Sequence, residues 1–590
     1  MKTLLVAINS RNLHTNLAVR YLYVCCKEEC LDVEIYEGNI NTRTEDLLSQ
    51  IYRQDISNYC FSTYIWNITE IIKIADSIRK LNPAAIIVFG GPEATFRSKE
   101  FISAEIADYI VQGDGEQDLP SLLKLLNEKT GFINEIKSKE ICQIDADEVP
   151  FPYCYDLSLL PTKDQLLYYE TSRGCPFSCS YCLSSSMYKV TYRSLEKVYK
   201  ELRFFMDNNV PLVKFVDRTW NGNQDRAKKI ITFILDNPSS TRFHFEAAGD
   251  LFDTELLSLM KKLPNDAVQL EIGIQTTNAE ALEAACRKTD LEKLKKNVEE
   301  IISWGNIHIH LDLIAGLPLE NFNSFAKSFD FAFNLKSQML QLGFLKLLHG
   351  SKLRSEEKHY GIVSNNFPPY EVLKTNEISY EELLVLKKVE EVLEHYYNSG
   401  KNRFAIDYII QALEIKPSKF FLEFSEFLTR ENFFKRKQAP KDSFAFLYEF
   451  CREIKRKICH ELTDQDFQNP MKDFLKPIIE IMRFDWVNSA INSPLPTFMQ
   501  TNNTCENSDV KKFILESTDF DLKDCNWTIL SEKSTNYFLE NTNVLHKYDD
   551  KLKTVKPTDS LILVFNSTKG KKINSKLLDV LICYNFNGIK

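Results

Sequence analysis

The chain has 590 residues, of which 44% are hydrophobic and 26% charged, a composition typical of a globular protein with several domains. Its formal net charge of −9 argues against a broad nucleic-acid-binding surface. No apolar run reaches about 18 residues, so the sequence predicts no transmembrane helix and no membrane partner.

The cysteines and the N-terminus indicate the cellular compartment. The chain has 15 cysteines, an odd number, and the apolar stretch near its start is too short for a secretory signal. We therefore expect a cytoplasmic protein, whose cysteines are thiols or metal ligands rather than disulfides.

Residues 1–140 alternate between strand-like and helix-like segments. "TLLVAI" at 3–8 is a short apolar run suited to a buried parallel strand, and four comparable runs follow, with helical segments between them. This pattern predicts a Rossmann-like, doubly wound α/β domain. Such sheets bind ligands at the carboxyl ends of their strands, where "GGPE" (90–93) and "GDGE" (113–116) are expected.

Three further regions follow. Residues 141–165 contain several prolines and are expected to form a linker. Residues 166–355 contain six strand-like runs with helical segments between them, which predicts a partial (β/α)6 barrel. Residues 370–590 are expected to form a mostly helical C-terminal domain, with two strands, "SLILVFNS" and "LLDVLICYNF", near its end.

The segment "SRGCPFSCSYC" holds three cysteines in the spacing C-x3-C-x2-C, directly after the first strand of the predicted barrel. Active sites of such folds lie at this end of the strands. A structural zinc site has four protein ligands, and no second cysteine pair or suitable histidine pair is nearby. An iron–sulfur cube takes four thiolates, so three would leave one iron open to bind a small molecule.

This spacing, with Tyr181 just before the last cysteine, resembles the radical S-adenosylmethionine (SAM) superfamily. The resemblance implies that Cys175, Cys179 and Cys182 are catalytic and hold a [4Fe-4S] cluster. Its open iron would chelate S-adenosylmethionine, which one electron cleaves to methionine and a 5′-deoxyadenosyl radical. The resemblance also implies a reductant such as flavodoxin or ferredoxin as a partner.

Two further segments resemble the branch that includes oxygen-independent coproporphyrinogen oxidases and methylthiotransferases. By this resemblance, Gln275 and Arg287 in "LEIGIQTTN…LEAACRKTD" hold the SAM carboxylate, which suits a guanidinium fork. Asp312 in "HLDLIAGLP" would bind the ribose hydroxyls, and Glu246 is a further candidate for contact with the nucleoside. The alternative for Asp312 and Glu246 is a structural carboxylate at a strand end.

The second barrel strand departs from the family pattern. The superfamily often carries a Gly-Gly-Glu motif there, which binds the methionine amino group, and "VKFVDRTWNGN" lacks it. Asp217 or Asn221 is expected to take its place, and Arg218 is expected to pair with a carboxylate.

The segments "FSTYIWN", "FGGPEAT" and "VQGDGEQDLPSLL" resemble the cobalamin-binding domain of a large radical SAM subgroup. The resemblance implies cobalamin as a cofactor, in a base-off state without a histidine ligand, because no D-x-H-x-x-G motif is present. Asn9 and His14 would face the corrin, His14 as a polar wall residue. Glycines would allow close approach of the backbone to the cofactor: Gly90, Gly91, Gly113 and Gly115. The alternative is a scaffold domain that binds nothing.

The whole order of segments resembles an uncharacterised subgroup of cobalamin-binding radical SAM proteins with a C-terminal domain of unknown function. The resemblance implies an enzyme that methylates an unactivated carbon of a small-molecule or unknown substrate. A radical rearrangement or ring contraction and a non-catalytic scaffold that binds cluster and cobalamin are the alternatives.

Overall fold

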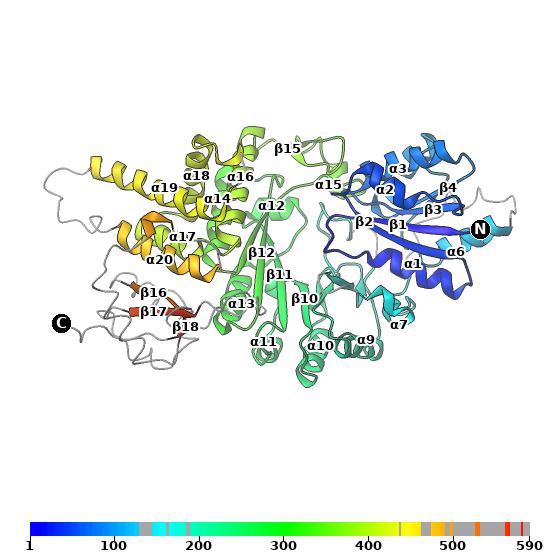
Figure 1. The fold of residues 1–590 in the computed structure, drawn as a ribbon, viewed down its shortest axis with the longest axis horizontal. Coiled ribbons are helices and arrows are strands. Elements are labelled where there is room, and N and C mark those ends of the chain that lie inside the picture. The colour runs from blue at the N-terminus through cyan, green and yellow to red at the C-terminus, as the bar shows by residue number, and fades with distance from the viewer. Residues whose placement is uncertain are drawn as a thin grey trace. The chain divides into compact units, whose positions relative to one another are not determined.

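The computed structural model describes residues 1–128, 144–160, 165–184, 189–435, 438–461, 474–489 and 496–499, and three short strands further along the chain. The chain divides into two compact units, residues 1–383 and 384–590 (Figure 1). Part of the expected linker at 141–165 and most of the chain beyond residue 461 lie outside the described residues.

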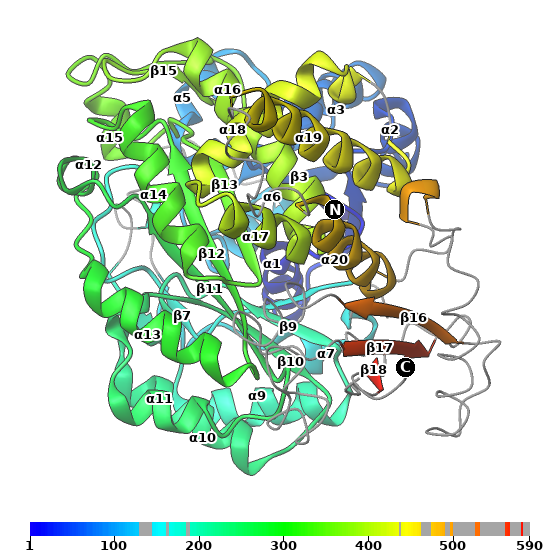
Figure 2. The same ribbon diagram turned by 90° about the vertical axis from the view of Figure 1, so that its left-hand side faces the viewer.

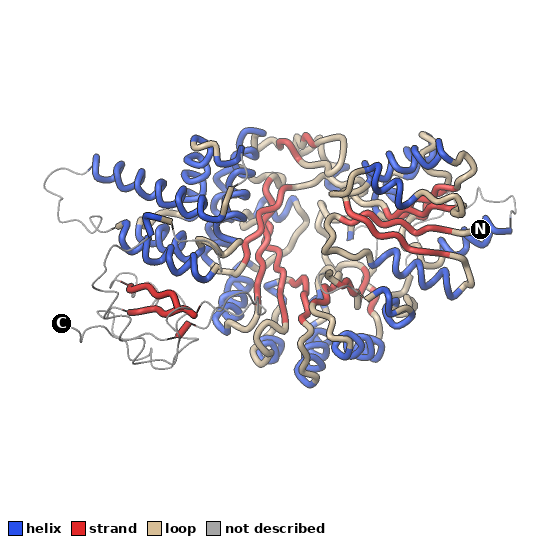
Figure 3. The backbone as a smooth tube through the Cα atoms, in the orientation of Figure 1, coloured by secondary structure: helices blue, strands red, loops and turns tan. Residues whose placement is uncertain are grey.

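The first unit begins with a five-stranded sheet in the order β2-β1-β3-β4-β5, and all neighbouring strands are parallel (Figure 3). Its strands are β1 (Thr3–Asn9), β2 (Val33–Asn39), β3 (Asn58–Ser62), β4 (Ile86–Gly90) and β5 (Tyr109–Val111). Its helices are α1 (Leu17–Glu28), α2 (Thr44–Ile51), α3 (Ile68–Leu81), α4 (Pro92–Phe96), α5 (Ser98–Ser103) and α6 (Asp118–Glu128). This arrangement confirms the predicted doubly wound fold.

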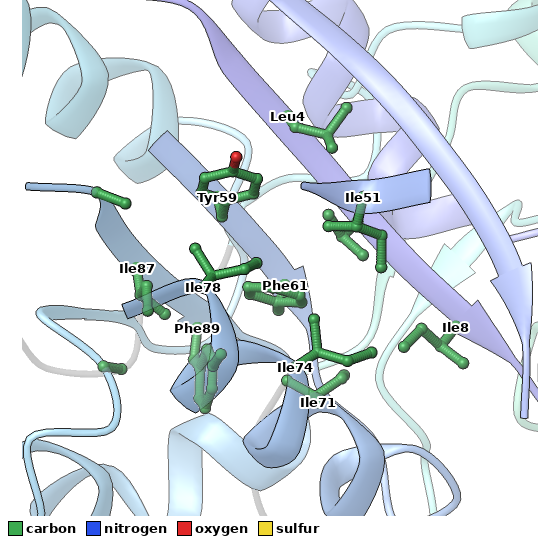
Figure 4. Close-up of a cluster of buried hydrophobic side chains, with 14 of the residues drawn as sticks. Leu4, Ile8, Ile51, Tyr59, Phe61, Ile71, Ile74, Ile78, Ile87 and Phe89 are labelled. Carbon is green, nitrogen blue, oxygen red and sulfur yellow. The ribbon is translucent and has the colours of Figure 1, made fainter. Parts of the chain in front are cut away.

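Helices cover both faces of this sheet, and a hydrophobic core lies on each face. All seven residues of β1 are buried. Because neighbouring side chains point to opposite faces, Leu4 and Ile8 pack in one cluster with Phe61, whereas Leu5 packs in another. Figure 4 shows the first cluster, where Phe61 lies beside Ile74 and Ile78 of the α3 helix. Burial on both faces explains why the strands are continuous apolar runs in the sequence.

The second sheet of this unit has six parallel strands, in the order β13-β12-β11-β10-β9-β6. The strands are β6 (Leu167–Tyr169), β9 (Leu212–Phe215), β10 (Arg242–Ala247), β11 (Val268–Gln275), β12 (His308–Ala315) and β13 (Met339–Phe344). The helices after them include α9 (Leu195–Asp207), α10 (Gln224–Asp236), α11 (Thr254–Met260), α12 (Ala279–Ala284), α13 (Leu291–Trp304) and α14 (Phe322–Asn334). The six-stranded partial barrel is confirmed.

Two central strands of this second sheet, β11 and β12, are fully buried on one face only. Along β11 and β12 every second residue is buried, and the residues between them are half-buried. The buried positions are apolar and face the helices that flank the sheet (Figure 2), whereas the alternate positions carry polar groups such as Glu271 and His310. The sequence had predicted apolar strands here, and the polar alternation along them marks the inner face of the barrel.

The second unit is mostly helical in its described part. It begins within α16 (Tyr380–Val392), and its further helices are α17 (Arg403–Ala412), α18 (Pro417–Arg430), α19 (Pro440–Glu461) and α20 (Leu475–Asn488). Phe420, Phe424 and Phe450 form ring contacts in its core. An antiparallel sheet follows: β16 (Cys525–Leu530), β17 (Leu561–Asn566) and β18 (Val580–Leu581). Strand β16 was not predicted.

None of the helices in the described ranges is both long and apolar enough to cross a membrane.

Candidate functional site

The three cysteines lie on a loop that leaves the carboxyl end of β6. The short strands β7 (Ser172–Arg173) and β8 (Thr191–Tyr192) pair with each other and close the base of this loop. Gly174 has φ 88°, a conformation that favours glycine, and turns the chain into Cys175. We call residues 172–182 the cluster loop. Its far end is held by two backbone hydrogen bonds of Ser180, to Ala285 and to Leu353.

Asp217 anchors the start of the cluster loop. Its buried carboxylate accepts hydrogen bonds from the backbone N–H and hydroxyl of Thr171 and from the hydroxyl of Ser172, at 2.5 to 3.2 Å. These contacts use both carboxylate oxygens. Asp217 therefore supports the loop, and its predicted contact with a cofactor would need some of these bonds to break.

Asn221, the other expected substitute for the missing Gly-Gly-Glu motif, is fully buried. Its amide donates to the carbonyl of Ala248 at 2.8 Å and accepts from the backbone N–H of Ala248 at 2.9 Å. It thus joins the loop after β9 to the end of β10. Arg218, by contrast, is exposed. The neighbouring Thr219 hydroxyl lies 3.6 Å from the Cys175 sulfur, so this loop lies directly beside the cluster loop.

Gln275 and Arg287 come together against Gly273 on β11. The Arg287 guanidinium donates from Nη2 to the Gly273 carbonyl at 2.6 Å, and its Nη1 lies 3.8 Å from the Cys179 sulfur. A Cβ at Gly273 would lie 2.2 Å from Nε2 of Gln275, so only glycine leaves room for this amide. The structure therefore places Arg287 beside the second cysteine of the motif, and Gln275 next to Arg287 at Gly273.

Asp312 lies next to this group, because it is the register partner of Gly273 on the neighbouring strand β12. Its Oδ1 atom is buried and has no hydrogen-bond partner among the described residues. Burial, together with the negative charges of Glu271 and Glu246, raises the pKa of Asp312 to about 8. An unpaired oxygen at this position fits a ligand that brings hydroxyl groups.

Glu246 lies on β10, where it is the register partner of Glu271 on β11. Burial raises the pKa of its carboxyl group, and the positive charge of Arg218 opposes that effect. The four residues predicted to contact SAM thus lie on or beside the adjacent strands β10, β11 and β12, on the inner face of the barrel.

A polar belt that the sequence reading missed lies on the same inner face. Glu271 Oε2 is 3.0 Å from both Lys214 Nζ on β9 and His244 Nε2 on β10. These contacts, His244 first, lower the pKa of Glu271 to about 2. The His310 ring packs 5.8 Å from that of His244, and burial lowers its pKa to about 4. Polar residues at every second position of these strands are the sequence signal for the belt.

The residues of this site fit SAM and a three-thiolate cluster. Arg287 Nε is a buried donor without a hydrogen-bond partner, and Asp312 offers the unpaired acceptor described above. Cys179 is buried, whereas Cys175 and Cys182 are half-buried on the loop. Burial raises the pKa of the Cys179 thiol, and the positive charge of the Arg287 guanidinium opposes this rise without cancelling it. Among the described residues, no three ligand side chains converge on a single-ion site.

The cobalamin candidates lie at the carboxyl edge of the first sheet. In a sheet of order β2-β1-β3-β4-β5 the direction of winding changes between β1 and β3, which is where such folds bind ligands. The amide of Asn9 donates to the His14 carbonyl at 3.0 Å and to Glu37 at 3.3 Å, so Asn9 shapes this edge. Asn67, which the sequence reading missed, is fully buried there and ties the ends of β1 and β3 together.

His14 faces the second sheet. Its Nδ1 lies 2.6 Å from the hydroxyl of Tyr168 on β6, and Leu13 accepts a backbone hydrogen bond from Leu166. Burial lowers the pKa of His14. The segment after β1 therefore adds to the edge of the barrel sheet, and His14 lies against a wall of that sheet.

The local structure explains in different ways why glycine stands at the four predicted positions. A Cβ at Gly91, which has φ 97°, would lie 2.6 Å from the Thr63 carbonyl, and one at Gly115 would lie 3.1 Å from Leu22. Gly113 has φ 75° and donates to the Thr95 hydroxyl. A Cβ at Gly90 would meet only ordinary contacts, at 3.7 Å or more. Packing and turn geometry therefore explain three of the glycines without any ligand.

An exposed tryptophan stacked on a tyrosine makes this edge suitable for a large flat ligand. Trp66, which follows β3, is 43% exposed and stacks on Tyr64 with ring centroids 4.3 Å apart. The Trp66 indole also donates to the Ile8 carbonyl at the end of β1. A large aromatic face held rigidly at the ligand-binding edge fits burial under a corrin.

Comparison with known families agrees with this geometry. Residues 3–123 match the B12 binding domain, residues 169–332 match the radical SAM superfamily, and residues 358–556 match a protein of unknown function, DUF4080. The chain joins a B12 binding domain to a radical SAM domain. The three cysteines, Gln275, Arg287 and Asp312 all lie within the radical SAM domain, and Asn9, His14 and the four glycines lie within the B12 binding domain.

Relatives of this chain include methyltransferases. It is 27% identical to the hopanoid C-3 methylase of Methylococcus capsulatus, over 48% of this chain and 58% of the methylase. It is 26% identical to the cobalamin-dependent radical SAM methyltransferase TokK of Streptomyces tokunonensis, over 45% of this chain and 43% of TokK. The chain thus spans only about half the length of these curated relatives.

The fold also has a solved counterpart. The cobalamin-dependent S-adenosylmethionine radical enzyme OxsB, solved with aqua-cobalamin bound, superposes with a TM-score of 0.55 at 14% identity. The match covers 88% of this chain and 85% of OxsB. At this identity the likeness establishes the shared fold.

Proposed function

We propose that this protein is a cobalamin-dependent radical SAM enzyme that transfers a methyl group to an unactivated carbon of a small-molecule substrate. The observation that carries the proposal is the group formed by Cys179, Arg287, Gln275 and Asp312 at the carboxyl end of the barrel. Within one compact unit, this group brings together the expected cluster ligand Cys179, the guanidinium of Arg287 and the buried, unpaired Oδ1 of Asp312. The relatives with methyltransferase names support the reaction class.

Each residue of this group would have a separate role in binding the cluster or SAM. Cys175, Cys179 and Cys182 would hold a [4Fe-4S] cluster. When bound, the cluster supplies the electron that cleaves SAM, and cobalamin supplies a carrier for the methyl group. Arg287 would bind the SAM carboxylate through its fork, assisted by Gln275. Asp312 is largely protonated near neutral pH and would both donate to and accept from the ribose hydroxyls.

The inner face of the barrel would exclude bulk water from the reaction. In its belt, Glu271 contacts both Lys214 and His244 at 3.0 Å, so the charge of this carboxylate is compensated before a substrate enters. Such a fixed polar lining favours a polar substrate over a hydrocarbon, since burying these groups against apolar surface would be costly.

The proposal is tested with SAM that carries a deuterated methyl group. Anaerobic, cluster-loaded and cobalamin-loaded protein is incubated with a reductant and a small-molecule extract, and new products are identified by mass spectrometry. We expect a product that gains the labelled methyl group. A product isomeric with its substrate, or no product despite SAM cleavage, would contradict methyl transfer.

Cobalamin binding is tested on the full chain by absorption and electron paramagnetic resonance spectra. We expect a base-off spectrum without nitrogen coupling from histidine, because His14 faces Tyr168. A histidine-on spectrum that changes in the His14→Ala variant would contradict this assignment.

The proposed reaction needs an electron donor, for which flavodoxin or ferredoxin has suitable chemistry. We place the protein in the cytoplasm, where thiols and reduced clusters are maintained.

A further inference from the structure

Arg173 lies two residues before the first cysteine of the cluster loop, and its side chain is only 10% exposed. Its Nε and Nη2 donate to Glu170 Oε1 at 2.9 and 2.7 Å, which fixes the guanidinium beside the end of β6. This local contact leaves the rest of the guanidinium free to reach across to the B12 binding domain.

The remaining partners of Arg173 all come from that domain. Nη2 donates to Glu116 Oε1, and Nη1 lies 3.1 Å from Asp114 Oδ2, close enough for an ion pair although not aligned for a hydrogen bond. The guanidinium also lies over the ring of Tyr21 on α1, 5.8 Å from its centroid. Both acids belong to the "GDGE" segment after β5, which therefore binds the cluster loop.

The charge balance shows that this contact is specific. Three carboxylates, each at most 14% exposed, surround one guanidinium. Buried acids are costly unless they are paired, and among the described residues Arg173 forms the ion pairs of all three acids. An arginine meets the geometry because its fork presents several donors in one plane, which the single ammonium of lysine does not.

We infer that Arg173 is a positioning residue that fixes the cluster loop against the cobalamin-binding edge of the first domain. The inference rests on the proposed function, since it assigns Arg173 the task of setting the geometry between the two cofactor sites. Asp217 holds the same loop from the barrel side, through Thr171 and Ser172. The loop is thus held from both sides at its base.

The test begins with protein free of cofactors, so that it does not depend on activity. Glu116→Gln and the double variant Asp114→Asn/Glu116→Gln weaken the contact from the B12 binding domain and leave the cluster loop unchanged in sequence. Amide hydrogen exchange is then measured across residues 172–182. We expect exchange there to be faster by at least about fivefold in the double variant, and less in the single variant.

Asp108→Asn is the matched control, because Asp108 forms its 2.9 Å ion pair with Arg79 inside the same domain and not with the cluster loop. Exchange in the loop should stay at the wild-type rate in this control. Unchanged exchange in both the Glu116→Gln and the double variant would overturn the inference. So would an equal rise in the control.

A second readout uses the loaded enzyme. In the Glu116→Gln variant, iron content should match wild type, whereas the ratio of methylated product to 5′-deoxyadenosine should fall at least about threefold. A fall in which iron and both products decrease together would indicate a merely structural role and overturn the inference. If wild type cleaves SAM without methyl transfer, the proposed function fails, and the exchange result still decides whether Arg173 couples the two sites.

Discussion

The two parallel sheets of the first unit differ in where they can carry functional groups. β1 is buried along its whole length, so the first sheet can present functional groups only on the loops at its edge. β11 alternates between buried and half-buried residues, so the second sheet carries functional groups on the strands themselves. Changes in the second sheet should therefore alter cofactor chemistry directly, whereas changes at the edge of the first should act through loop geometry.

The largest expected effect comes from the cluster loop. Replacing Cys175, Cys179 and Cys182 by alanine should reduce the iron content from about four per chain to near zero and abolish SAM cleavage. Iron and sulfide assays on anaerobically reconstituted protein measure this.

Cys286→Ala is the control for the cluster variants, because Cys286 is adjacent to Arg287 but lies outside the motif. It should retain full iron content. Retention of iron in the triple variant would show that the cluster assignment is wrong.

Arg287→Lys should have the next largest effect. It keeps the charge but loses the fork beside Gly273 and Cys179, so we expect SAM affinity to fall by about one to two orders of magnitude. Titration of SAM against cluster-loaded protein measures the affinity, with iron content determined in parallel.

The exposed Arg203→Lys provides a charge-preserving control on α9. If Arg287→Lys leaves the affinity for SAM unchanged, Arg287 only supports the β11 backbone and does not bind SAM. Loss of iron together with affinity would instead assign it to the cluster loop.

Asp312→Asn should raise the stability of the cofactor-free protein at alkaline pH. The pKa of Asp312, about 8, lies above the value of about 3.9 for an unfolded aspartate. Such a group contributes stability below about pH 4 that is progressively lost as the pH rises to 8. Because asparagine cannot ionise, the stability of the variant relative to wild type should be about 4 kcal/mol higher at pH 8 than at pH 5.

Urea unfolding at pH 5 and pH 8 measures this difference, with the exposed Asp207→Asn as control. A gain that is equal at both pH values would show that ionisation of Asp312 is not its cause.

The smallest effect is expected where the two domains meet at His14. Tyr168→Phe removes the 2.6 Å contact between the hydroxyl and Nδ1 of His14 and should cost about 0.5–1.5 kcal/mol of unfolding free energy. The base-off cobalamin spectrum should not change. A new histidine-on spectrum in this variant would show that His14 can reach cobalt once Tyr168 releases it.

The sequence predicted the order of elements well, because apolar strand runs and intervening helices are local signals. Both sheets and the C-terminal helices follow from such runs. It also placed Cys175 and Arg287 in one site, since each follows a strand end of the same barrel.

Contacts between distant segments could not be predicted in the same way. The glycines of "GDGE" were expected to lie close to the cofactor, whereas no role was predicted for its two acids, which both pair with Arg173, 57 residues further along in the case of Glu116. Asp217 was expected to bind a cofactor, and its oxygens are taken by Thr171 and Ser172. Only the register of strands and loops in three dimensions decides which partner a buried carboxylate has.

The central claim is that a cluster held by the three cysteines of the cluster loop, with Arg287 binding SAM beside it, cleaves SAM reductively. The most direct measurement is the yield of 5′-deoxyadenosine and methionine from SAM and a reductant with anaerobic wild-type protein. We expect both products in equal amounts, and neither from the Cys175→Ala variant. A protein that holds about four irons per chain yet forms no 5′-deoxyadenosine would contradict the account.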